Sequence, residues 1–145
     1  MKLSVNQAAM NLIKEFEGCR LTAYQDVGGV WTIGYGHTPA REGQVITQVE
    51  ANALLSDDVQ WAALRVQDEC TGPTTPNQFG AMASLCFNIG GGAFAESSVL
   101  RYHNEGRYQS AANSFRLWDM VGDRHNYGLL RRRIAEAQLY LKEEA

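Results

Sequence analysis

The sequence predicts an α+β fold that is mostly helical, with a small N-terminal β-hairpin or three-stranded sheet lobe. Short extended stretches bounded by glycine-containing turns occur before residue 47, whereas capped apolar patterns with helical spacing fill most of the remainder. A length of 145 residues is typical of a single domain. We therefore expect a single domain, 1–145, with a β lobe at about 18–46 and a helical lobe at about 70–145 that also includes the N-terminal helix. A helix at about 48–68 would join the two lobes.

The N-terminal segment predicts a helix that ends at Glu17. Ser4 and Gln7 have the spacing of a capping box, and an apolar stripe follows them. Gly18 then suits the left-handed residue that often ends a helix, because a glycine has no Cβ to clash there.

The next segment predicts a hairpin. Leu21–Gln25 and Val30–Tyr35 are the expected strands, Asp26–Gly29 is the turn, and Gln44–Ile46 is a candidate third strand. Period-2 alternation places Thr32 on the strand face opposite the large apolar side chains.

Five further helices complete the expected helical scaffold, one of them a short helix through Tyr102 that Ser97 or Ser98 would cap. Thr47 and Glu50 form a second capping-box pattern, and the apolar pattern after them suggests a buried face of Val49, Ala53, Leu54, Trp61 and Leu64.

Thr75 followed by Pro76 is a good helix start, and the apolar run to Ile89 predicts the most enclosed helix. The glycines at 90–92 predict a loop that ends it. Further helices are expected at 108–118 and from about residue 127, with a flexible loop at 120–126 between them.

Glu17, Asp26 and Thr32 are the candidate catalytic residues. Glycoside cleavage needs a protonated carboxyl that donates to the leaving oxygen and a second carboxylate that assists water or stabilises positive charge. A glutamate at a helix C-terminus lies at the negative end of the dipole, which favours the protonated form, while Asp26 at a wetter turn would stay ionised. Thr32 could position the attacking water. Taken singly, the three residues also fit a solvated helix end, a turn former and a strand former.

The order and spacing of these residues resemble the phage-type lysozymes, glycoside hydrolase family 24. Glu17, Asp26 and Thr32 match the family's catalytic triad, and the Gly34–His37 segment matches its GxGH motif. The resemblance covers essentially the whole chain, and it continues through the segments 75–79 and 87–92, Trp118, Gly128, Leu129, Arg132, Arg133 and Glu136.

The resemblance implies an endolysin that hydrolyses the β-1,4 bond between N-acetylmuramic acid and N-acetylglucosamine in peptidoglycan, causing host cell lysis. It implies no metal or cofactor, and it favours inversion at the anomeric carbon. A lytic transglycosylase acting on the same bond and a catalytically dead peptidoglycan-binding module are the two alternatives. The presence of Asp26 and Thr32 argues against the first, and the intact triad argues against the second.

The resemblance also suggests supporting residues. His37 is expected to form a structural ion pair with Asp58; the alternatives are a neutral His37 that donates to a backbone carbonyl and a solvated Asp58. Asn88 could contact the substrate or simply cap its helix.

The resemblance further implies that an arginine of the last helix positions Glu17. Arg131, Arg132 and Arg133 span too much of the helix circumference for all three to face one partner. Arg132 is the first choice and Arg133 the second, while at least one of the three would be a solvated basic residue.

Composition and charge bear on partners and location. The net charge of −3 argues against nucleic-acid binding, and no apolar segment has the length of a signal peptide or membrane span. The three cysteines show no metal-binding spacing, so we expect free thiols and synthesis in a reducing cytoplasm. We expect a monomer. The resemblance implies that it stays in the host cytoplasm until a holin permeabilises the membrane and then reaches the periplasm and the peptidoglycan glycan strands.

Overall fold

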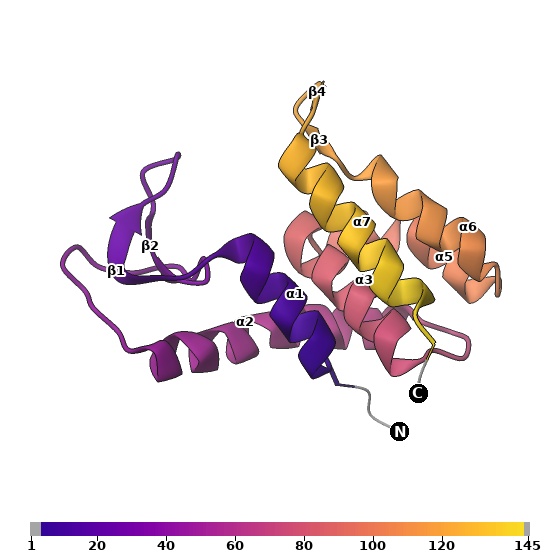
Figure 1. Ribbon diagram of the computed structural model, residues 1–145, viewed down its shortest axis with the longest axis horizontal. Coiled ribbons are helices and arrows are strands. Elements are labelled where there is room, and N and C mark those ends of the chain that lie inside the picture. The colour runs from indigo at the N-terminus through magenta and orange to yellow at the C-terminus, as the bar shows by residue number, and fades with distance from the viewer. Residues whose placement is uncertain (1–3, 144–145) are drawn as a thin grey trace. The chain divides into compact units, whose positions relative to one another are not determined.

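The computed structural model describes residues 4–143. The chain divides into two compact units: Ile13–Trp61 forms one, and the residues up to Leu12 together with those from Ala62 onward form the other. We call the first the hairpin unit and the second the helical unit (Figure 1). The elements are α1 (Gln7–Glu17), β1 (Arg20–Gln25), β2 (Trp31–Gly34), α2 (Gln48–Glu69), α3 (Pro76–Ile89), α4 (Gly91–Ala95), α5 (Ser98–Asn104), α6 (Tyr108–Ser114), the 3-10 helix η1 (Phe115–Leu117), β3 (Met120–Val121), β4 (Arg124–His125) and α7 (Tyr127–Leu141).

The predicted α+β class and the predicted hairpin are confirmed. Strands β1 and β2 pair antiparallel, with Tyr24 opposite Thr32. The candidate third strand is reduced to one isolated bridge between Thr22 and Val45. Ile33 is buried as well as Thr32, so both faces of β2 are covered. The small core of the hairpin unit contains Ile33, Ile46 and Ala51.

The two predicted helix starts differ in outcome. At α2 the capping box is present, because the Glu50 amide donates to Thr47 Oγ1 over 3.1 Å and the Thr47 amide donates to Glu50 Oε1 over 3.0 Å. At α1 the expected cap by Ser4 is wrong. Asn6 directly precedes the helix, and its Oδ1 accepts from the Ala9 amide at 3.0 Å. This is the position from which a short side chain reaches the third helical N–H.

The buried face of α2 also differs from the prediction. Val49 is 77% exposed, and Trp61 and Leu64 are each 44% exposed. Both the predicted and the buried residues follow the helical repeat, and the two sets lie on different sides of α2, so periodicity by itself did not identify the buried side. The buried stripe is Ala51, Leu55, Val59, Ala62 and Val66.

The core of the helical unit is built around α3, as predicted. Thr75 caps α3 with a complete capping box, Pro76 occupies its first turn, and the helix is buried along most of its length. Helix α7 packs against α3, and α5 packs against α6 (Figure 1). Within residues 4–143, no helix combines the length and hydropathy needed to cross a membrane.

Two loops expected in this unit are instead regular structure. Gly90 caps α3, but Gly91 and the residues after it form the short helix α4. The segment expected to be a flexible loop at 120–126 contains the hairpin β3–β4, in which Met120 pairs with His125. His125 Nδ1 also lies 2.9 Å from Oδ2 of the buried Asp119, which holds the hairpin at its base.

Candidate active site

Glu17 ends α1 within the hairpin unit. Gly18 adopts a φ of +70° after it, and the Gly18 amide donates to the Lys14 carbonyl over 3.0 Å, so the predicted glycine cap is confirmed. The Glu17 side chain is half-buried. A Cβ added to Gly36 would lie 3.4 Å from Glu17 Oε1, which places the backbone after β2 directly beside this carboxyl group.

Asp26 lies at the exposed turn between β1 and β2. Its Oδ1 accepts from the Val30 amide at 2.9 Å, while its own amide donates to the Val30 carbonyl over 2.9 Å. The Gly29 amide closes the turn by donating to the Asp26 carbonyl. The carboxylate is thus fixed in direction by the turn and remains open to solvent.

Thr32 lies on β2 and is only 4% exposed. Its hydroxyl donates to the Val30 carbonyl over 2.9 Å. Because a hydroxyl has one proton, this bond leaves Oγ1 with acceptor lone pairs. Oγ1 can therefore accept a hydrogen bond from a water molecule, and Val30 anchors both Thr32 and Asp26 through its backbone.

His37 and Asp58 are in contact, as expected. His37 Nδ1 lies 2.8 Å from Asp58 Oδ2, and the two side chains are 25% and 29% exposed. The backbone of His37 also pairs with Ile33. This contact joins the segment after β2 to α2 inside the hairpin unit.

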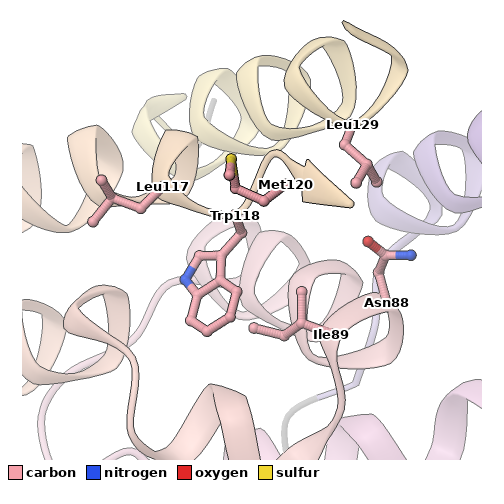
Figure 2. Close-up of a pocket in the computed structure, with 6 residues that line it drawn as sticks. All are labelled: Asn88, Ile89, Leu117, Trp118, Met120 and Leu129. Atoms are coloured by element: carbon pink, nitrogen blue, oxygen red, sulfur yellow. The ribbon is translucent and has the colours of Figure 1, made fainter. Parts of the chain in front are cut away.

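The helical unit carries a pocket of about 470 Å³. Figure 2 shows Asn88 at one edge and the Trp118 indole across from it, with apolar side chains between them. Asn88 is the residue of this pocket that the sequence predicted. The apolar side chains that line the pocket were not predicted to meet there, because they come from segments about 30 residues apart in the chain. The remaining lining residues are Ile89, Leu117, Met120 and Leu129.

The three arginines of α7 have different environments. Arg131 is exposed, whereas Arg132 and Arg133 are 3% and 0% exposed. Both buried arginines pair with the buried Glu136: Arg133 Nε lies 2.9 Å from Oε1, and Arg132 Nε lies 3.3 Å from Oε2. Burial raises the pKa of the Glu136 carboxyl, and the two guanidinium groups act in the opposite direction. The positioning of Glu17 by Arg132 stays a prediction.

The sequence did not predict that Ser84 and Glu136 form a buried polar cluster with Arg132 and Arg133. The Ser84 hydroxyl donates to Glu136 Oε2 inside the helical unit. The spacing of Glu136, three and four residues after the two buried arginines, is the signal that could have indicated this cluster. Among the described residues, no three His, Cys, Asp or Glu side chains are grouped so that they could hold a metal ion.

Comparison with known proteins places this geometry in a family. Residues 14–136 match the family model described as phage lysozyme. The chain is 39% identical to the endolysin of Salmonella phage P22 over 96% of the chain and 99% of that protein. It is 40% identical to the endolysin of Bacillus phage B103 over 99% of the chain, but it spans only 56% of that protein. The chain thus covers about half the length of the Bacillus phage relatives, since the endolysin of phage PZA is covered over 55%.

Solved structures agree with this match. The muramidase domain of SpmX from Asticaccaulis excentricus superposes with a TM-score of 0.91 at 42% identity, covering 97% of this chain and 99% of that one. The hairpin with its three candidate catalytic residues and the helical scaffold are thus features of a chain that belongs to the phage lysozyme family.

Proposed function

We propose that this protein is a muramidase of the endolysin type, which hydrolyses the β-1,4 bond between N-acetylmuramic acid and N-acetylglucosamine in peptidoglycan. The observation that carries the proposal is the common anchoring of Asp26 and Thr32 on Val30, in the same unit as Glu17. Membership of the phage lysozyme family supports it.

In the proposed reaction Glu17 is the general acid. It donates its proton to the glycosidic oxygen as the bond from the anomeric carbon to that oxygen breaks. A water molecule attacks the anomeric carbon, and Asp26 takes the proton that this water loses. Thr32 Oγ1 accepts the water's other hydrogen, because its own proton is committed to the Val30 carbonyl. We propose inversion, so the new hydroxyl lies on the face opposite the leaving group.

The proposal is tested with permeabilised Gram-negative cells. Wild-type protein should clear the suspension, and Glu17→Gln, which has the same shape but no acidic proton, should not. Circular dichroism of both proteins controls for folding. Equal clearing by both proteins would show that Glu17 is not the general acid. Wild-type protein that binds wall fragments without clearing cells would favour a binding module.

Thr32 gives an independent test of the water-positioning step. Thr32→Val keeps the shape but removes the acceptor oxygen, and we expect kcat to fall about a hundredfold, within the range for a misplaced reacting group. Thr32→Ser should retain most activity. The mass of the products separates the reaction classes, because hydrolysis adds one water molecule for each bond cleaved, whereas a transglycosylase leaves an anhydro ring. NMR of the fresh product then shows whether the anomeric configuration is inverted or retained.

We further propose that the protein acts as a monomer without cofactor. It would remain in the host cytoplasm until a holin opens the membrane and would then act on the glycan strands from the periplasm. Cell fractionation before and after induced permeabilisation tests this route. Enzyme found in the periplasm before permeabilisation would contradict it.

A further inference from the structure

The hairpin unit has a pocket of about 280 Å³ that lies between α2 and the segment before this helix. All of its lining residues belong to the unit Ile13–Trp61, and none of them is a candidate catalytic residue. The proposed reaction therefore gives this pocket no role. The lining residues are Gln44, Ile46, Glu50, Ala53, Leu54 and Asp57.

The middle of the pocket is apolar. Ile46 is 8% exposed and belongs to the small core of the hairpin unit, and Leu54 packs against that core. Ala53 is exposed beside Leu54, and its side chain is only a methyl group, so it covers little of the surface around it. These side chains can pack against methylene groups of a ligand but offer them no hydrogen bond.

Two carboxylates flank this apolar surface along α2. Glu50 precedes Leu54 by four residues, and Asp57 follows Leu54 by three, so the three side chains lie on one side of the helix. Seven residues of an α-helix rise about 10.5 Å, which separates the two carboxylates by two turns. Glu50 Oε1 accepts from the Thr47 amide at 3.0 Å, and this bond leaves Oε2 available to a cation.

The charge of these carboxylates is not neutralised locally. Residues 42–64 contain no lysine, arginine or histidine. Asp58 pairs with His37, but within residues 4–143 no basic side chain forms an ion pair with Glu50 or Asp57. The pocket is therefore complementary to a ligand that is positively charged at both ends and apolar between them.

We propose that this pocket binds a linear aliphatic diamine, with one ammonium group at Glu50, the other at Asp57, and the methylene chain over Ile46 and Leu54. An ammonium group donates three hydrogen bonds and accepts none, which matches an ionised carboxylate. The chain adds an apolar contact that an inorganic cation lacks. Because neither carboxylate takes part in the proposed hydrolysis, this inference goes beyond the muramidase function.

An NMR titration of the whole protein with cadaverine tests the site. Cadaverine has an ammonium group at each end of five methylene groups, and it should shift the backbone amide signals of Ala53 and Leu54. Both carboxylates are exposed, so we expect a Kd of about 1 mM at low ionic strength. Pentylamine has the same chain with one ammonium group and should bind about fivefold more weakly, as expected for the loss of one exposed ion pair. Equal binding of the two amines, or no shift at these residues, would overturn the inference.

A double variant tests which residues hold the diamine. Glu50→Gln with Asp57→Asn keeps the shape of both side chains, and glutamine still offers an oxygen to the Thr47 amide, so the Kd for cadaverine should rise about tenfold or more without loss of folding. The matched control is Glu15→Gln with Glu42→Gln, which removes as many charges from exposed positions of the same unit outside the pocket. Its Kd should stay within about twofold of the wild type at about 0.15 M ionic strength, where screening extends over about 8 Å.

Equal weakening by the two double variants would show that general negative charge attracts the amine, and it would overturn the inference. Circular dichroism of all variants controls for folding. Wild-type protein that clears no cells would end the proposed muramidase function, and the cadaverine titration would still decide whether the pocket binds a diamine.

Discussion

His37 Nδ1 lies 2.8 Å from Asp58 Oδ2, and this contact connects the segment that follows β2 to α2. Asp58→Asn removes the carboxylate that the His37 ring contacts, and it should lower the free energy of unfolding by about 1 to 2 kcal/mol. Chemical denaturation measures this loss. Asp57→Asn, at an exposed neighbouring position, is the control and should change stability by less than about 0.5 kcal/mol. A loss equally small for Asp58→Asn would contradict the ion pair.

Gly36 should be needed for activity because of its contact with Glu17, and not only because of its positive φ. Gly36 and Gly43 have φ values of +79° and +80°, so alanine should strain both positions alike, by roughly 1 to 2 kcal/mol. Only at Gly36 would the added Cβ meet the Glu17 carboxyl, at 3.4 Å; nothing lies within 4 Å at Gly43.

We therefore expect similar melting temperatures for Gly36→Ala and Gly43→Ala, but slower clearing of permeabilised cells for the first, because its methyl group would contact the Glu17 carboxyl and restrict the space around it. Clearing rates and thermal melts of both variants provide the comparison. Equal activity would show that the contact with Glu17 has no catalytic consequence.

His103 should make the helical unit acid-sensitive. Its ring lies between Thr74 Oγ1, 2.8 Å from Nε2, and the Tyr140 hydroxyl, 2.6 Å from Nδ1. Burial lowers the pKa of His103 from its ordinary 6.5 to about 4. Protonation therefore favours the unfolded chain: the stabilisation is complete above pH 6.5 and is lost as pH falls toward 4.

The expected loss is about 3 kcal/mol across this window, from 1.36 kcal/mol per pKa unit. Urea unfolding at several pH values should show a shallower pH dependence for His103→Gln than for the wild type. A wild-type slope in His103→Gln would assign the acid sensitivity to other groups.

Glu136→Gln should strongly destabilise the protein. It removes the carboxylate shared by two buried guanidinium groups, and breaking a buried pair in this way costs about 3 to 5 kcal/mol. Glu69→Gln breaks a partly exposed pair with Arg65 and should cost less than about 1 kcal/mol. Denaturation midpoints of the two variants test the difference, and similar losses would mean that burial adds nothing to the Glu136 cluster.

The local structure around the candidate site was largely predictable. The Thr47 capping box, the glycine cap after Glu17 and the turn at Asp26 depend on residues a few positions apart. Hydrogen bonds over such short separations are nearly determined by residue type, so the sequence pattern indicates them directly.

Longer-range features were less predictable. The buried stripe of α2 was missed because apolar residues with helical spacing lie on two sides of this helix, and Trp61 on the predicted side is 44% exposed. The hairpin at 120–125 was expected to be a flexible loop; it is held by the contact of His125 with the buried Asp119.

The sequence by itself determined the fold class, the three candidate catalytic residues and the family, because these follow from residue order and local spacing. Only the tertiary structure decided which arginines of α7 are buried and that Arg133 reaches Asn88, 45 residues away. Three consecutive arginines look alike in sequence. Their environments differ because the packing of α7 against α3 encloses Arg132 and Arg133 beside one carboxylate and leaves Arg131 in solvent.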